Sequence, residues 1–254
     1  MKTVYGPVPS WRLGRSLGID PVCTKRKICS FDCVYCQLGK TLEKTDERRE
    51  FVKTDVFEKD LTDILKSAKA DMITFSGTAE PTLAANLSDM LEIIREHSML
   101  PVAILTNSSF LPRKEVRQDL SKFDEVVAKL DAPNQEIFMD INKPHETIGF
   151  RDVVSGIREF RKTFRGKLAL QMMFMDSNEN YAKEMVKLAD SIDADEIQVN
   201  TPLRPCVAKP LSKERLKEIA ELFTSKNVVC VYDAKKPKVE VDDMKELKKR
   251  RPVL

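Results

Sequence analysis

Apolar runs that alternate with amphipathic stretches are the feature of this sequence that most restricts its fold. From residue 50 onward, short apolar runs such as MITFSG (72–77) and VAILT (102–106) are separated by longer stretches with apolar residues at helical spacing. Strands that alternate with helices in this way form right-handed βαβ units and a parallel sheet. We therefore predict an α/β fold.

The predicted elements amount to six βα repeats and one extra strand. Strands are expected at 16–20, 72–77, 102–106, 125–130, 167–175, 196–200 and 228–232, and helices at 56–68, 87–96, 113–120, 153–164, 181–190 and 213–223. Six repeats are fewer than the eight that close a full barrel, so a partial (β/α)6 TIM-like barrel with a parallel sheet is favoured. A flat, doubly wound sheet fits the same pattern. Both folds place function at the carboxyl ends of the strands.

Length and charge restrict the rest of the organisation. The 254 residues fit one domain spanning 1–254, with a core of about 14–204 and a C-terminal extension of about 205–254. Forty-three basic and forty acidic residues leave a net charge of +3, which neither requires nor excludes a nucleic-acid partner. No apolar segment approaches the roughly 20 residues that cross a bilayer, and no secretory signal is seen. We expect a cytoplasmic monomer without membrane contact.

Three of the six cysteines lie within eight residues, a spacing typical of metal or cluster ligands. Cys29, Cys33 and Cys36 form the pattern C-x3-C-x2-C, with the aromatic Tyr35 directly before the last cysteine. Three thiolates on one short loop can bind three irons of a 4Fe–4S cluster and leave the fourth iron open to a small molecule. Zinc is the alternative, but zinc ligands usually come as two pairs and the sequence has no second C-x-x-C.

The cysteine motif resembles the signature of the radical S-adenosylmethionine (radical SAM) superfamily, C-x3-C-x-aromatic-C, and the order of elements after it is also similar. In such enzymes S-adenosylmethionine chelates the open iron. An electron from the reduced cluster cleaves its sulfonium, which gives methionine and a 5′-deoxyadenosyl radical that abstracts hydrogen from a substrate. The resemblance therefore implies a radical SAM core with two cofactors, a 4Fe–4S cluster and S-adenosylmethionine. It also implies a flavodoxin- or ferredoxin-like electron donor.

The segment Ser76-Gly-Thr-Ala-Glu80 looks like the Gly-Gly-Glu region of the superfamily, where a turn after a strand contacts the methionine part of S-adenosylmethionine. Ala79 departs from that pattern, because glycine usually precedes the glutamate. Polar residues at later strand ends complete the contacts that the resemblance implies. The expected cofactor-binding residues are Tyr35, Ser76, Gly77, Thr78, Glu80, Asn107, Asp131, Gln171 and Asn200.

Two residues are candidate catalytic groups. Lys129, at the end of the fourth expected strand, could form a Schiff base with a keto-acid co-substrate, as lysines do in wyosine-type chemistry. Cys206 follows the sixth strand, where it could donate a hydrogen atom, quench a radical or ligate a second metal centre; a loop cysteine without a role is the alternative. Cys230 is expected in the core, and Cys23 is not expected to be a ligand.

Four segments make the resemblance more specific: 5–20, 33–40, 76–83 and 141–145 are similar to iron–sulfur oxidoreductases related to wyosine-type tRNA base synthases. The implied substrate is a tRNA base. The basic residues expected to form a phosphate-contacting rim are Arg12, Arg15, Lys25, Arg26 and Lys27.

Alternative functions stay open at this point. One is a radical activase or modifying enzyme that acts on a protein or on a cofactor precursor. Another is an electron-transfer protein that does not cleave S-adenosylmethionine, although such a protein needs no turn like 76–80. The lysine-rich segment after Ala234 is expected to be a solvated helix or tail, or else a contact for RNA.

Overall fold

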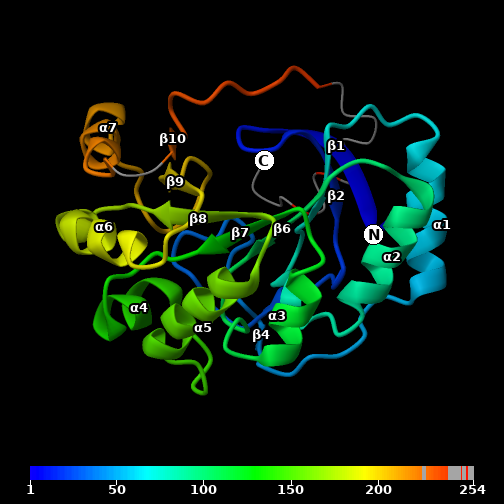
Figure 1. Ribbon diagram of the computed structural model, residues 1–254, viewed down its shortest axis with the longest axis horizontal. Helices are drawn as coiled ribbons and strands as arrows, with labels where there is room; N and C mark the ends of the chain where they lie inside the picture. Colours follow the sequence, from blue (N-terminus) through cyan, green and yellow to red (C-terminus); the bar gives the residue numbers. More distant parts are fainter. Residues whose placement is uncertain (225–226, 240–246, 248–249, 251–254) are drawn as a thin grey trace.

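A single eight-stranded sheet forms the centre of the molecule, in a computed structural model that describes residues 1–224, 227–239, 247 and 250. The strand order is β1-β2-β5-β6-β7-β8-β9-β10 (Figure 1). The strands of this sheet are β1 (Val4–Ser10), β2 (Gly14–Ile19), β5 (Met72–Phe75), β6 (Val102–Thr106), β7 (Glu125–Lys129), β8 (Lys167–Met173), β9 (Glu196–Asn200) and β10 (Asn227–Cys230). A separate two-stranded parallel pair is formed by β3 (Ile28–Cys29) and β4 (Glu43–Lys44).

Helices follow the parallel strands in the chain. The α-helices are α1 (Thr54–Leu65), α2 (Leu87–His97), α3 (Lys114–Leu120), α4 (Gln135–Asn142), α5 (Phe150–Thr163), α6 (Ala182–Asp190) and α7 (Lys213–Glu221). Two 3₁₀ turns, η1 (Pro81–Leu83) and η2 (Glu179–Tyr181), lie after β5 and before α6. None of the helices within the described residues is long and apolar enough to cross a membrane.

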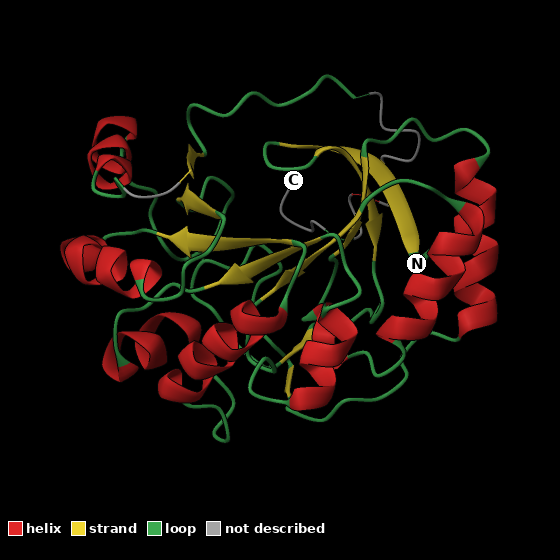
Figure 2. Ribbon diagram, in the orientation of Figure 1, coloured by secondary structure: helices red, strands yellow, loops and turns green. Residues whose placement is uncertain are grey.

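The sheet is a partial barrel. Pairing is parallel from β2 through β10, and β1 adds one antiparallel strand at the edge. The helices lie along the outer side of the curved sheet (Figure 2), as in the predicted six-repeat partial barrel and unlike a doubly wound sheet with helices on both faces. No pairing joins β1 to β10 in the described part of the chain, and residues 231–239, orange in Figure 1, cross over this open side.

The sequence prediction missed several elements, of which β1 and α4 are the longest. The strand β1 contains Pro7 and Pro9, which argue against a strand, but it is an edge strand and so tolerates residues without an N–H. The helix α4 has eight residues, and Asn134 caps it by accepting a hydrogen bond from the Ile137 N–H at 3.0 Å. The basic residues Lys248, Lys249 and Arg251, at the lysine-rich end, lie outside the described residues.

Apolar faces of the helices fill the space outside the sheet. Helix α5 has its apolar residues at spacings of three and four, so that Val153, Ile157 and Phe160 are all buried. The ring of Phe160 stacks on that of Phe164 with centroids 4.6 Å apart. The core therefore lies between the helices and the outer face of the sheet, and the inner face is left for polar groups and a cavity.

Gly156→Ala tests how closely α5 packs. A Cβ at Gly156 would lie 2.4 Å from the backbone nitrogen of Pro112, in the loop after β6, and backbone cannot move aside cheaply. We expect the free energy of unfolding to fall by about 2 kcal/mol in chemical denaturation, although alanine has the better helix propensity. Ser155→Ala, at an exposed position of the same helix, is the control and should have little effect. Equal stability of the two variants would contradict the packing argument.

Candidate active site

The three clustered cysteines face one cavity at the carboxyl ends of the parallel strands. Cys29, Cys33 and Cys36 all line this cavity, which has a volume of about 400 Å³, and none of them is in a disulfide. The other lining residues that the sequence analysis had singled out are Arg12, Lys27, Tyr35, Ser76, Gly77, Glu80, Asn107, Lys129, Gln171 and Asn200. Residues from seven separate parts of the chain thus converge on one space.

The loop of cysteines is held by the carboxyl end of α4. The N–H of Asp32 donates to the Asn142 carbonyl oxygen at 3.0 Å, and that of Val34 donates to the Ile141 oxygen at 2.9 Å. The N–H of His145 donates in turn to the Ser30 oxygen at 2.7 Å. The last carbonyls of a helix have no partner within the helix, so the loop supplies the donors they lack. This docking gives the segment 141–145 a structural role that its sequence did not reveal.

Burial keeps two of the three thiols protonated when no metal is bound. Burial raises the pKa of Cys29 to about 12, with the nearby Glu80 carboxylate adding to the shift, and it raises the pKa of Cys33 to about 11. A thiol in such surroundings becomes a thiolate when a metal replaces its proton. Side-chain amides lie beside both sulfurs: Asn107 Nδ2 is 3.8 Å from Cys29 Sγ, and Asn142 Nδ2 is 3.5 Å from Cys33 Sγ.

The turn after β5 requires a glycine at position 77. Gly77 has φ +150°, and a Cβ there would lie 2.3 Å from Cγ of Asp20. The Asp20 carboxylate comes this close because it accepts hydrogen bonds from the N–H and hydroxyl of Thr78, at 3.2 and 3.0 Å. On the cavity side, the Ser76 hydroxyl is 3.0 Å from the Tyr5 hydroxyl. The end of β2 thus fixes the conformation of this turn.

Glu80 joins the same turn to the next strand. One carboxylate oxygen accepts from the hydroxyls of Thr82 and Thr106, at 2.6 and 2.7 Å, and the other accepts from the N–H of Asn107 at 2.7 Å. Burial raises the pKa of Glu80, and these hydrogen bonds oppose the shift. The buried carboxylate therefore braces the ends of β5 and β6 against each other while it lines the cavity.

A second polar network surrounds Tyr35, which also lines the cavity. The Tyr35 hydroxyl donates to Asp131, whose other carboxylate oxygen accepts from the N–H of Met173 at 2.9 Å. Burial raises the pKa of Tyr35 well above its ordinary value, and the Asp131 charge adds to the shift. The Lys129 ammonium is 3.7 Å from Asp131 and lies over the Tyr35 ring at 4.4 Å. These contacts hold Lys129 at the cavity wall.

Three of the predicted site residues are not among those that line the cavity. Thr78 lies behind the turn against Asp20, and Asp131 lies behind Tyr35. Cys206 donates to the Ala208 oxygen at 3.2 Å; burial raises its pKa, and Cys36 lies near enough to add to the shift. Cys230 is buried in the core, as predicted.

The expected phosphate-contacting rim does not form. Arg15 is bonded to Asp71 at the amino ends of β2 and β5, away from the strand ends that carry the cysteines. Lys27 is buried and donates to the Gly39 oxygen at 2.8 Å. Lys25 and Arg26 are exposed. The five residues therefore do not form one rim: Arg12 and Lys27 line the cavity, whereas Arg15 is held by Asp71 away from it.

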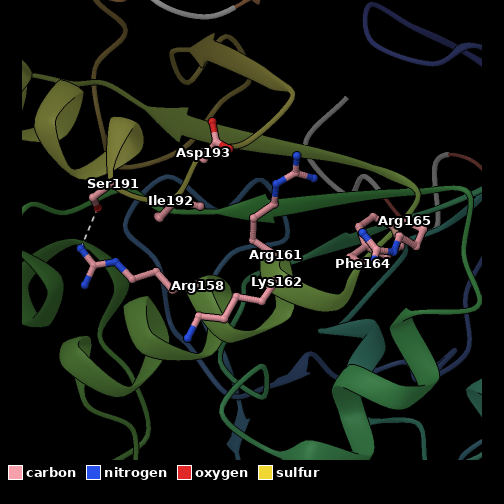
Figure 3. A pocket seen from close by; sticks show the side chains of 8 residues that line it. All are labelled: Arg158, Arg161, Lys162, Phe164, Arg165, Ser191, Ile192 and Asp193. Atoms are coloured by element: carbon pink, nitrogen blue, oxygen red, sulfur yellow. Dashed lines mark hydrogen bonds between the residues drawn. The ribbon is translucent and has the colours of Figure 1, made fainter.

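A second cavity, of about 370 Å³, lies near the carboxyl end of α5 and is lined by basic side chains (Figure 3). Arg158 donates to the Ser191 hydroxyl at 2.6 Å, and Arg161 pairs with Asp195 at 3.0 Å. Because these groups already have partners within the protein, this cavity offers less to a ligand than the one beside the cysteines.

Gly77→Ala tests the fixed turn. We expect the free energy of unfolding to fall by about 2 kcal/mol, because the new Cβ would collide with Asp20 and release the Thr78 bonds. Gly39→Ala is a matched control, since Gly39 also has positive φ (+76°) but no atom lies within 4 Å of its Cβ position. Chemical denaturation of both variants separates the strain of alanine at positive φ, which both share, from the collision with Asp20, which only Gly77→Ala has. A similar loss in each would mean that the approach of Asp20 is unimportant.

Comparison with known proteins shows the family of this chain. The family model of the radical SAM superfamily matches residues 26–189. A UPF0026 protein of Methanocaldococcus jannaschii is 36% identical over 235 residues, which cover 90% of this chain and 72% of the relative. A UPF0026 protein of Synechocystis sp. is 39% identical over 215 residues, 83% of this chain and 78% of the relative.

Solved structures share the fold at low sequence identity. Native anSMEcpe with bound AdoMet has a TM-score of 0.65 at 20% identity, over 85% of this chain and 64% of that one. Streptococcus suis SuiB, bound to the precursor peptide SuiA, has a TM-score of 0.64 at 15% identity, over 86% and 49% of the two chains. Archaeal TYW1 has a TM-score of 0.57 at 12% identity, over 84% and 72%. This chain thus spans between about half and three quarters of their lengths. It belongs to the radical SAM superfamily of enzymes and, within it, to the UPF0026 proteins.

Proposed function

We propose that this protein binds a 4Fe–4S cluster through Cys29, Cys33 and Cys36 and cleaves S-adenosylmethionine reductively. The observation that carries the proposal is that the three free cysteines and the Ser76–Glu80 turn face the same cavity. When bound, the cluster would supply one electron to the sulfonium, yielding methionine and a 5′-deoxyadenosyl radical.

The donors in the cavity fit such a cluster. Three cysteines line it, and among the described residues no fourth cysteine and no histidine does so. One iron would therefore be left for the amino and carboxylate groups of S-adenosylmethionine. A closed four-ligand zinc site fits less well, because it would need a further protein ligand here.

The residues around the cysteines have distinct tasks in this proposal. Glu80 keeps the Ser76–Gly77 backbone at the cavity, where the methionine end of S-adenosylmethionine would bind. Gln171 and Asn200, near the ends of β8 and β9, offer further polar contacts to the cavity. Lys129 presents its amine to the same space, either to a substrate anion or to a keto group.

For the substrate, we infer a tRNA base from the resemblance to wyosine-type synthases. Because the basic rim does not form, any RNA contact near the cysteine loop would depend on exposed residues such as Lys25 and Arg26. A protein substrate is the second candidate, and SuiB bound to its precursor peptide is a case of that kind on the same fold. RNA that copurifies and is released by salt would favour tRNA, whereas capture of one native protein would favour the second candidate.

The electron would come from a flavodoxin- or ferredoxin-like donor, and we infer a cytoplasmic site of action. Both inferences follow from the chemistry, since a radical enzyme of this kind needs a low-potential reductant. Loss of turnover when the donor is withheld, and recovery with a purified flavodoxin, would support this partner.

The first prediction for the proposed function concerns the cysteines. After anaerobic reconstitution with iron and sulfide, Cys29→Ala, Cys33→Ala and Cys36→Ala should each lose the cluster and form no 5′-deoxyadenosine when reduced with dithionite and S-adenosylmethionine. Cys230→Ala, which removes a buried core thiol, should keep both properties. A cluster without cleavage in the unaltered protein would favour electron transfer instead.

The second prediction separates the turn from the cysteine loop. Glu80→Ala should weaken S-adenosylmethionine binding by about tenfold or more, because the turn loses its hydrogen bonds to β6, while iron content stays unchanged. Equilibrium dialysis and iron analysis measure the two effects. Glu92→Ala, on the exposed side of α2, is the control. Loss of iron in Glu80→Ala would show instead that the segment supports the loop.

A further inference from the structure

We infer that Asn142 sets the reduction potential of the cluster by donating a hydrogen bond to the sulfur of Cys33. The inference rests on the proposed function, because it requires a cluster on the three cysteines. It concerns a residue that lies 109 positions beyond Cys33 in the sequence and that cysteine spacing does not indicate.

Asn142 is fixed relative to the cysteine loop at two points. It is the last residue of α4 and is buried. Its backbone carbonyl accepts the N–H of Asp32 at 3.0 Å, and its side-chain Nδ2 lies 3.5 Å from Cys33 Sγ. Both the backbone and the side chain of Asn142 contact the cysteine loop, and these two contacts fix the position of the amide relative to the loop.

The surroundings determine which way the amide points. Its Nδ2 faces three acceptors: Cys33 Sγ, the Tyr35 oxygen at 3.2 Å and Asp131 Oδ2 at 3.2 Å. The Tyr35 hydroxyl uses its own hydrogen on Asp131, so toward Asn142 it is an acceptor. A flipped amide would turn its carbonyl oxygen toward a carboxylate and a sulfur, which is repulsive. The N–H donors thus face the cysteine.

The amide also leaves one polar atom without a partner. Asn142 Oδ1 is buried and accepts no hydrogen bond from the described residues. An unmet buried acceptor typically costs about 1–3 kcal/mol. Packing alone therefore does not explain an asparagine at this position. The contacts that its side chain makes in the site are those of its N–H groups.

A donor at this sulfur acts on the reduced state more than on the oxidised state. Reduction adds one negative charge to the cluster, part of which falls on the ligating sulfurs, and an N–H···S bond stabilises that charge. The effect grows with burial, and Cys33 is partly buried at the cavity wall. Asn107 is a weaker candidate for the same role, because its Nδ2 lies 3.8 Å from Cys29 Sγ and donates to the Ser30 hydroxyl at 2.9 Å.

The test is a redox titration of the reconstituted protein, followed by the EPR signal of the reduced cluster without S-adenosylmethionine. Asn142→Leu keeps the volume and removes the donor. We expect its equilibrium constant for reduction to fall about tenfold, a midpoint potential lower by about 59 mV. Asn142→Asp replaces the donor by an acceptor and should also lower the midpoint potential. It is the variant to measure if Asn142→Leu assembles little cluster.

The matched control is Asn134→Ala, which weakens the amino-terminal cap of the same helix and leaves the Asn142 amide in place. Its potential should equal that of the unaltered protein. An equal shift in Asn134→Ala would mean that loosening α4 causes the effect, and an unchanged potential in Asn142→Leu would overturn the inference directly.

Pulsed EPR gives a second, direct test. In protein labelled with ¹⁵N-asparagine, a nitrogen coupled to the reduced cluster should persist in Asn107→Ala and disappear in Asn142→Leu. Its absence from the unaltered protein would overturn the inference while the cluster itself upheld the proposed function. Failure of the unaltered protein to assemble any cluster would instead remove both.

Discussion

Hydrogen bonds between the cysteine loop and the carboxyl end of α4 are the contacts on which the site depends. Loop N–H groups of Asp32 and Val34 pair with carbonyls that the helix itself cannot satisfy. In this way a loop with little regular structure becomes part of a rigid element. The three sulfurs reach one cavity because the helix end fixes the path of the backbone between them.

Buried carboxylates perform a similar task around the rest of the cavity. Asp20 holds the turn after β5, Glu80 joins that turn to β6, and Asp131 joins β8 to Tyr35. Each is buried, and each offsets the cost of burial by accepting several hydrogen bonds. The strand ends are therefore braced by polar groups on the inside, where an apolar core would fill the space that a cofactor needs.

The side of the barrel between β1 and β10 is not closed by strand pairing in the described part of the chain. The sheet ends at β1 and β10 without closing, so in the described part of the chain the inner face is covered there by residues 231–239 and not by a strand. Val231 and Lys236 of this segment line the cavity, so the segment takes part in the site.

The sequence by itself determined the features that are local. Hydrophobic periodicity predicts the alternation of strands and helices, so the partial barrel could be predicted. Cys29, Cys33 and Cys36 lie close together in one loop, so their grouping could be predicted as well. Tertiary structure decided the rest. Asn142 reaches Cys33 because the cysteine loop docks on the carboxyl end of α4. Asp20 reaches Gly77 because β2 and β5 are neighbouring parallel strands. Tertiary structure also decided the fate of the expected basic rim, because Asp71 holds Arg15 at the amino ends of β2 and β5 while Arg12 and Lys27 line the cavity.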